Sequence, residues 1–393
     1  MDYSRYIAKN VADIPPSGIR KFFDVVSTTK GAISLGVGEP DFVTPWNIRD
    51  AAIKSIQKGY TQYTSNWGLP ELREEIADYL KHRYNVIASP KDGLFITIGA
   101  SEAIDVAIRA LVEVGDEVLI PDPSYVSYSP CVRICGGKAV PVPCREEEEF
   151  ILTKSALEAV YTDKAKALIL PYPNNPTGAT MTKSQLREVA DFCIEHDLIV
   201  ISDEIYSELV YNDEYTSIAS FADMRDRTIY VSGFSKSFAM TGWRIGYVAG
   251  PAEIVSAMIK IHQYCIMCAP VFSQYAALAA LRQGKEDGFA TVAEMREQYD
   301  RRRLFIVNSL RDIGMDCFMP TGAFYAFPSV KKFNMTGEEF CERLLESKKV
   351  AVVPGSAFGE SGTYNVRCSY AYSLKNLQTA LGRIAEFVAE LKV

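Results

Sequence analysis

The sequence predicts an α/β fold, with a large domain built on a mostly parallel sheet flanked by helices and a smaller α+β domain. Between roughly residues 90 and 250, short β-rich runs such as GLFITIG and LIVISDE alternate with helical patterns such as TKSQLREVADFCIEHD. Such alternation is typical of parallel strands joined by helical crossovers. After about residue 285 the pattern changes to a long charged helix, short strands and a closing helix, which indicates a second domain.

The chain has 393 residues, which is long enough for more than one domain. We assign residues 46–284 to the large domain. Residues 285–393 form the small domain, and the N-terminal segment 1–45 is expected to pack with them. The turn IPPSGIR, residues 14–20, is expected to contribute to a lid over the functional site.

Composition argues against nucleic acid and membranes as partners. The formal net charge is −7, so the chain has no general attraction for phosphate backbones or anionic lipid. The apolar segment 254–281 contains Lys260 and His262 and is predicted to be a core helix, not a membrane span. The N-terminus has no signal-peptide pattern, so a cytoplasmic protein is expected.

Cysteine usage favours free thiols over a metal site. The nine cysteines are scattered, as suits a reducing cytosol. Cys265 and Cys268 have CxxC spacing, but no second pair matches them and they lie in an apolar helical stretch. Buried free thiols are therefore expected there, and no metal is predicted.

Four segments with polar or phosphate-suited residues follow predicted strands. They are residues 99–101, 174–178, 203–206 and 232–236. Open α/β sheets bind ligands at the carboxyl ends of their strands. We therefore expect these segments to meet at one site.

Lys236 and Arg244 lie eight residues apart in SGFSKSFAMTGWRIGY. Taken alone, Lys236 fits an ordinary surface lysine. In a partly desolvated site, its amine would instead form a Schiff base with an aldehyde cofactor. The guanidinium of Arg244 offers a fork that can bind a phosphate through two hydrogen bonds.

The other strand ends carry residues with two interpretations each. Asp203 either caps a helix or pairs with a protonated pyridine nitrogen, which keeps the ring an electron sink. Asn175, in the turn PYPNNPTG, either serves the turn or binds a phenolic oxygen. The helix start GASEA offers free backbone N–H groups to a phosphate, although most such starts bind nothing.

The order and spacing of these motifs are far more specific than any single one. GASEA, PDPSYVSY, NNPTG, SDEIYSELV, SKSFAMTGWRIGY and NVRCSYA resemble the class I aminotransferases of pyridoxal phosphate fold type I. Upstream, SLGVGEPDF and YTSNWGLPELREEIADYL resemble the same family. The resemblance spans nearly the whole chain. It implies a sheet of the seven-stranded type and pyridoxal 5′-phosphate as the cofactor.

The resemblance also implies roles for individual residues. Lys236 matches the lysine that forms the internal aldimine and then moves the proton between Cα and C4′. Asp203 matches the pyridinium partner, and Tyr206 and Asn175 match residues that bind the phenolic oxygen. The catalytic set is therefore Lys236, Asp203 and Tyr206. Ala100, Ser101, Ser235 and Arg244 match the phosphate contacts, with Ser232 as a further candidate, and Tyr125 matches the ring that stacks on the pyridine.

The resemblance extends to the substrate and to a second subunit. Arg367 matches the arginine that binds the substrate α-carboxylate, although without its motif it would fit a surface ion pair. Gly38 would offer its N–H to the same carboxylate, with Tyr125 and Asn175 nearby. Tyr63 matches a tyrosine that reaches the phosphate of the neighbouring subunit, which implies a homodimer with shared active sites.

These matches predict an aminotransferase that passes the amino group of an L-amino acid to a 2-oxo acid, with 2-oxoglutarate expected, by a ping-pong mechanism. Some aspartate-specific relatives look to have a lysine where this chain has Ser101, so narrow aspartate specificity is in doubt. Tyr63, Tyr125 and Tyr325 would equally suit a pocket for aromatic or aliphatic side chains.

Two other functions compete with transamination. A β-eliminating C–S lyase would use the same lysine, but in such lyases the asparagine loop reads differently from NNPTGAT. A binding module, as in regulators that carry this fold behind a winged helix, would need far more than the first 30 residues. The acidic balance of the chain also argues against DNA.

Overall fold

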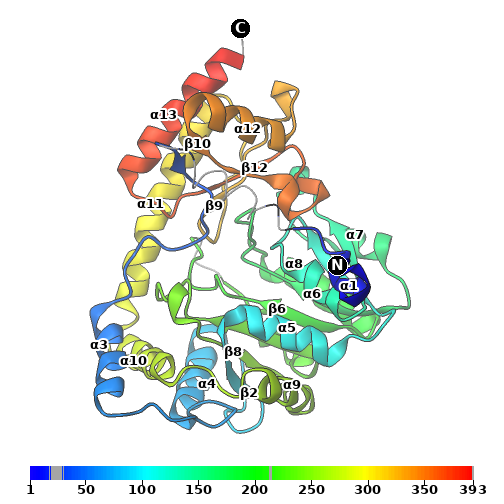
Figure 1. Ribbon diagram of the computed structural model, residues 1–393, viewed down its shortest axis with the longest axis vertical. Coiled ribbons are helices and arrows are strands. Elements are labelled where there is room, and N and C mark those ends of the chain that lie inside the picture. Colours follow the sequence, from blue (N-terminus) through cyan, green and yellow to red (C-terminus); the bar gives the residue numbers. More distant parts are fainter. Residues whose placement is uncertain (17, 19–28, 30, 212–214, 392–393) are drawn as a thin grey trace.

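The computed structural model describes residues 1–16, 18, 29, 31–211 and 215–391. The segment 14–20, predicted to contribute to a lid, lies partly outside these residues. The protein has a large sheet surrounded by helices, and a smaller part beside it that contains the C-terminal helices (Figure 1).

The large sheet has seven strands in the order β2-β8-β7-β6-β5-β3-β4. The strands are β2 Leu94–Thr97, β3 Glu117–Asp122, β4 Lys138–Pro143, β5 Ala165–Leu170, β6 Ile199–Asp203, β7 Thr228–Gly233 and β8 Gly246–Ala249. β8 is antiparallel to both of its neighbours, and the other pairs are parallel. The predicted mostly parallel seven-stranded sheet is confirmed.

Helices cover both faces of this sheet, because its central strands are apolar on both sides. On one face, α5 Gly99–Leu111, α6 Tyr128–Ile134 and α9 Ala252–Cys265 pack against alternate strand residues. On the other, α7 Lys154–Val160, α8 Lys183–Glu195, α4 Pro70–Tyr84 and α10 Val271–Asp287 pack against the residues between them. α3 Trp46–Gln57 lies against α10 (Figure 1).

The prediction of one core helix over 254–281 is wrong. The segment forms two helices, α9 and α10, separated by residues 266–270. Pro270 directly precedes α10, where its fixed φ and missing N–H suit a helix start but not a helix interior. No helix of the described residues is long and apolar enough to cross a membrane.

The smaller part holds two short sheets. β9 Tyr325–Ala326, β11 Val353–Pro354 and β12 Val366–Ser369 form an antiparallel sheet in the order β11-β12-β9, and β1 Ile33–Ser34 pairs in parallel with β10 Val350–Ala351. α11 Ala290–Asp312, α12 Gly337–Lys348 and α13 Leu374–Leu391 pack around them. The boundary predicted between residues 284 and 285 falls in the last turn of α10, and the domain division stays a prediction.

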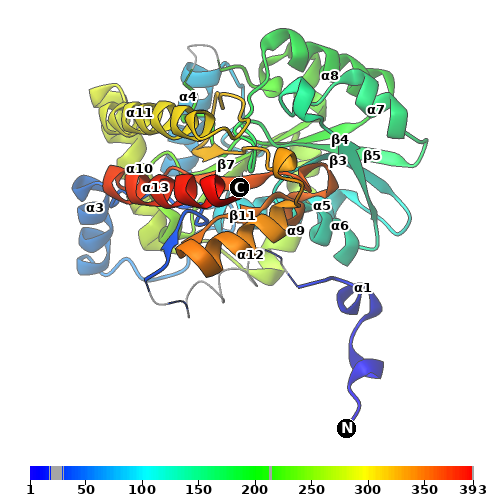
Figure 2. The same cartoon turned by 90° about the horizontal axis from the view of Figure 1, so that it is seen from above.

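The N-terminal segment projects from the body of the molecule (Figure 2). It carries α1 Lys9–Ala12, where Asn10 donates a hydrogen bond to the carbonyl of Ile134 at 2.6 Å. The described 3₁₀ turns are η1 Ser4–Tyr6, η2 Glu146–Glu148, η3 Ile218–Ser220, η4 Ala222–Arg227, η5 Thr241–Trp243, η6 Lys331–Phe333, η7 Gly355–Phe358 and η8 Glu360–Gly362.

All nine cysteines are free thiols. Cys265 is exposed at the end of α9 and Cys268 is half-buried, so the expectation that both are buried is wrong. The break between α9 and α10 brings this segment to the surface.

Candidate active site

A cavity of about 510 Å³ opens at the carboxyl ends of the parallel strands, between the large sheet and the smaller part. Eleven of the predicted site residues line it: Gly38, Ala100, Ser101, Tyr125, Asn175, Asp203, Tyr206, Ser235, Lys236, Arg244 and Arg367. Ser232 does not line it, because its buried hydroxyl donates to the carbonyl of Glu204 at 3.2 Å. The four strand-end segments therefore meet, as expected from the topology of the sheet.

Lys236 follows β7 in a tight turn that directs its amine into the cavity. Nζ donates a hydrogen bond to the carbonyl of Gly38 at 2.6 Å. Burial, helped by the nearby Arg367 and Arg244, lowers the pKa of Lys236 to about 8. Glu39 and Asp203 act in the opposite direction. An appreciable fraction of this amine is therefore neutral, and nucleophilic, near neutral pH.

Asp203 is a buried carboxylate at the last position of β6. Its Oδ2 accepts a hydrogen bond from the hydroxyl of Tyr128 at 2.7 Å, and its Oδ1 accepts one from the backbone N–H of Ile205 at 3.3 Å. Burial raises the pKa of Asp203 above its usual value. A buried carboxylate on the cavity wall is suited to a cationic ligand atom such as a pyridinium nitrogen.

The start of α5 and Arg244 form a region suited to an anion. Gly99 has φ 71°, and the first-turn residues Ala100 and Ser101 line the cavity with the N–H groups that a helix start leaves unpaired. The guanidinium of Arg244 packs so closely on Gly99 that a Cβ there would lie 2.6 Å from Nη2. Ser235 lines the same cavity.

A buried pair supports this helix start from behind. Glu102 Oε1 lies 2.5 Å from Nδ1 of His262, which is fully buried. The other carboxylate oxygen of Glu102, Oε2, accepts a hydrogen bond from the backbone N–H of Ile98, the residue before α5, at 2.5 Å. This pair fixes the turn from which α5 begins.

Arg367, on β12, is held by partners from distant segments. Nη1 donates to Oδ1 of Asn175 at 2.8 Å, and Nη2 donates to the carbonyl of Gly36. Its guanidinium carbon lies 4.5 Å from the ring centre of Tyr325 and 4.7 Å from that of Phe358. Nε is buried and has no partner among the described residues. This planar, buried cation suits a carboxylate.

Two tyrosines and a glycine close the cavity beside Arg367. The hydroxyls of Tyr206 and Tyr325 are hydrogen-bonded at 2.8 Å, and burial raises the pKa of Tyr206 well above its usual value. A Cβ on Gly38 would lie 2.4 Å from the Tyr325 hydroxyl, so only glycine fits there.

Tyr63 does not line the cavity of its own chain. Its side chain is 80% exposed on the loop between α3 and α4. The predicted contact of Tyr63 involves a second subunit, so this position leaves that prediction untested.

Sequence reasoning missed several residues of the site. Tyr128 is the principal one, because it is the side-chain donor to Asp203 among the described residues. Its spacing of three residues from Tyr125, just after β3, is the signal that could have pointed to it. Glu102 and His262 are 160 residues apart and gave no such signal.

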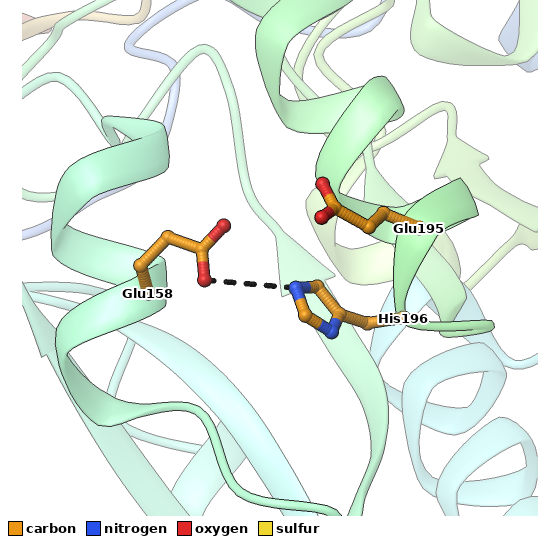
Figure 3. Close-up of side chains that lie close together, drawn as sticks. All are labelled: Glu158, Glu195 and His196. Carbon is orange, nitrogen blue, oxygen red and sulfur yellow. Dashed lines mark ion pairs between the residues drawn. The ribbon is translucent and has the colours of Figure 1, made fainter.

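One group of potential metal ligands occurs among the described residues, outside the cavity. Glu158, Glu195 and His196 lie close together at the ends of α7 and α8 (Figure 3). The ammonium of Lys154 lies 2.8 Å from Glu195 and 3.9 Å from Glu158. Lys154 therefore already forms ion pairs with both carboxylates.

The comparisons with known proteins agree with this geometry. The family model "Aminotransferase class I and II" matches residues 30–384. The chain belongs to this family. It is an aminotransferase, and its cofactor is pyridoxal 5′-phosphate. An amine, a buried carboxylate and an anion-binding helix start in one cavity fit the aldehyde, ring nitrogen and phosphate of that cofactor.

Individual relatives in this family match nearly the whole chain. The protein YugH of Bacillus subtilis (strain 168) is 52% identical over 98% of each chain. The aspartate aminotransferase of Pyrococcus abyssi is 48% identical over 97% of each chain. The crystal structure of the aromatic aminotransferase from Pyrococcus horikoshii superposes with a TM-score of 0.90 at 46% identity, covering 94% of this chain and 99% of the other.

Proposed function

We propose that this aminotransferase moves the amino group of an L-amino acid to a 2-oxo acid, with 2-oxoglutarate as the acceptor, by a ping-pong mechanism in a single cavity. The observation that carries the proposal is the shared cavity of Lys236, Asp203 and Arg367. These three side chains offer an amine, a buried anion and a buried cation. A cofactor and an α-carboxylate together require all three.

Bound pyridoxal phosphate supplies an aldehyde that receives the amino group and a ring that withdraws electrons from the substrate Cα. Lys236 would hold the cofactor covalently through its aldehyde carbon. When its amine is free, Nζ would act as base and then acid, taking the proton from the substrate Cα and delivering it to C4′ of the cofactor, with the reverse transfer in the second half-reaction. The lowered pKa of Lys236, about 8, leaves Nζ able both to accept and to release a proton near neutral pH.

The surrounding residues orient the cofactor. Asp203 would hold the ring nitrogen in its protonated form, and Tyr128 keeps the carboxylate in place through its 2.7 Å hydrogen bond. Tyr206 and Asn175 would bind the phenolic oxygen, and Tyr125 would contact the ring. The phosphate contacts come from Ala100, Ser101, Ser235 and Arg244, which line the anion-binding part of the cavity.

Arg367 and the backbone N–H of Gly38 bind the substrate α-carboxylate. Amino acids and 2-oxo acids share this group, so both half-reactions can use the same contact. The amino donor is not set by Arg367, because every amino acid carries an α-carboxylate. One relative is named for aspartate and another for aromatic substrates. Ser101 offers no charge to a distal carboxylate, which supports a donor range wider than aspartate.

The proposed enzyme is a cytoplasmic homodimer with shared active sites. Large apolar side chains remain exposed on α3 and the loop that follows it, and around the break between α9 and α10: Trp46, Ile53, Ile56, Tyr60, Tyr63, Tyr264, Ile266, Met267 and Phe272. Burying such side chains against a second copy would remove them from water. Tyr63 would then reach the phosphate in the partner's cavity.

Absorption spectroscopy of the holoenzyme tests the reaction. A suitable L-amino acid alone should abolish the absorption band of the lysine-bound cofactor, and 2-oxoglutarate should restore it. Release of pyruvate and ammonia from cystathionine without any oxo acid would contradict the proposal and favour a C–S lyase. A panel of amino donors with 2-oxoglutarate, pyruvate and oxaloacetate then identifies the preferred pair.

A further inference from the structure

Asp122, the last residue of β3, is a buried acid with no part in the reaction proposed above. Its side chain does not line the cavity. Oδ2 accepts the backbone N–H groups of Glu360 at 3.2 Å and Ser361 at 3.5 Å, whereas Oδ1 is buried without a partner among the described residues. Burial raises the pKa of Asp122 to about 6. A buried carboxylate with an unsatisfied oxygen is costly, so a compensating role is expected.

The contact between Asp122 and the turn 358–361 joins the large sheet to the smaller part of the molecule, and a second hydrogen bond lies beside it. Besides the carboxylate of Asp122, the backbone N–H of Ser124 donates to the carbonyl of Phe358 at 3.0 Å. Gly359 has φ 143°, and a Cβ there would lie 1.7 Å from Oδ1 of Asp122. The turn 358–361 can therefore approach Asp122 only with glycine at this position.

The turn carries Phe358, which packs on Arg367. The Phe358 ring is buried, and its centre lies 4.7 Å from the guanidinium carbon, with Tyr325 also in contact at 4.5 Å. On the other side of the contact, Tyr125 directly follows Ser124 and lines the cavity. The contact thus connects the wall that holds Tyr125 with the guanidinium of Arg367.

We propose that Asp122 is a positioning residue for the α-carboxylate site, acting through the turn 358–361 and Phe358 on Arg367. The inference rests on the proposed role of Arg367. Without the carboxylate, two N–H groups lose their acceptor and the turn relaxes, so Phe358 no longer fixes the guanidinium plane. An arginine with more freedom must be ordered by each substrate, which weakens binding of every substrate.

Steady-state kinetics of the holoenzyme variant Asp122→Ala test the proposal. KM should rise about tenfold for amino donors and for 2-oxo acids alike, while kcat changes less than about twofold. The cofactor dissociation constant should stay unchanged. Asp122→Asn should restore KM to nearly the wild-type value, because its amide oxygen still accepts the two N–H groups.

A matched control lies at the other end of the same strand. Glu117 is also buried, but it pairs with Lys138 and Thr162, away from the cavity. Glu117→Gln should leave KM and kcat unchanged, so a KM increase specific to Asp122→Ala separates positioning from general destabilisation. Gly359→Ala disturbs the same contact from the opposite side and should raise KM even if Asp122→Ala does not fold.

A double-mutant cycle tests the route through Phe358. Phe358→Ala alone should raise KM, and adding Asp122→Ala to it should cause little further increase. Fully multiplicative effects would overturn the proposed route, as would an Asp122→Asn variant as impaired as Asp122→Ala. If Arg367→Ala raises KM but Asp122→Ala and Gly359→Ala do not, this inference fails alone. If Arg367→Ala leaves KM unchanged, the proposed role of Arg367 itself is wrong.

Discussion

The two walls of the cavity are built in different ways. The wall proposed to hold the cofactor, here the cofactor wall, contains Asp203, Lys236 and the start of α5, and comes from strand ends of one continuous buried sheet. The wall proposed to bind the α-carboxylate, here the carboxylate wall, contains Gly38, Tyr325 and Arg367, and comes from segments far apart in the chain. The hydrogen-bond partners of Arg367 are 192 and 331 residues away from it in sequence.

This difference predicts that a substitution in one wall leaves the function of the other wall intact. The cofactor wall is held by strand pairing within a core that is buried on both faces, so its geometry depends little on the smaller part. The carboxylate wall depends on contacts between the large sheet and the smaller part. Changes in the first wall should therefore affect chemistry and cofactor binding, and changes in the second should affect substrate binding.

The largest effect is expected from Lys236→Ala. Turnover should fall about 10⁴-fold, because both the covalent attachment and the proton transfer are lost. Cofactor should still bind through Asp203 and the phosphate contacts, but without the absorption band of the lysine-bound form. Lys260→Ala, an exposed lysine on α9, is the matched control. Substantial activity in Lys236→Ala would refute the assignment.

The pH dependence of cofactor attachment tests the same lysine. Only the neutral amine attacks an aldehyde, so the attachment rate of the cofactor-free protein should rise with pH and level off above pH 8, near the pKa of Lys236. At pH 7 about 300-fold more neutral amine is expected than for a lysine at its usual pKa. Borohydride trapping at timed intervals measures the rate. An inflection above pH 10 would mean that burial does not lower the pKa.

Arg367→Ala should impair substrate binding and leave cofactor binding intact. KM should rise about 100-fold for every amino acid, because a buried cation that binds a carboxylate contributes about 3 kcal/mol. The cofactor dissociation constant and the absorption spectrum should match those of the wild type. An effect confined to dicarboxylic substrates would mean that Arg367 binds the side chain instead.

The smallest effect is expected from Tyr128→Phe. Loss of one hydrogen bond to Asp203 costs about 1 kcal/mol, so kcat or cofactor affinity should fall about fivefold, with KM for amino acids unchanged. The exposed Tyr364, changed to phenylalanine, provides the control. A selective rise in KM would place Tyr128 in the carboxylate wall and break the distinction between the walls.

The residues that could be predicted from the sequence alone belong to the cofactor wall and not to the carboxylate wall. Asp203 and Lys236 could be located because one ends an apolar strand run and the other follows such a run closely, and the topology of an α/β sheet brings such ends together. The carboxylate wall could be predicted only through resemblance, because no local pattern shows that Arg367 meets Asn175. The pairing of Glu102 with His262 was missed for the same reason.

Local patterns also failed where one residue interrupts a favourable run. The apolar content of 254–281 indicated a single helix, but Pro270 begins a second one and exposes Cys265. The run RIGYVAG was recognised as a strand. Its antiparallel direction in β8 depends on the short connection from β7, which carries Lys236, and not on its own residues.

Gly38 has a consequence for the engineering of substrate range. Its carbonyl accepts a hydrogen bond from Lys236, and the Tyr325 hydroxyl leaves no room for a Cβ. Randomising this position would yield inactive variants, whatever substrate is sought. Libraries are better directed to Val37, which lines the cavity with an exposed side chain.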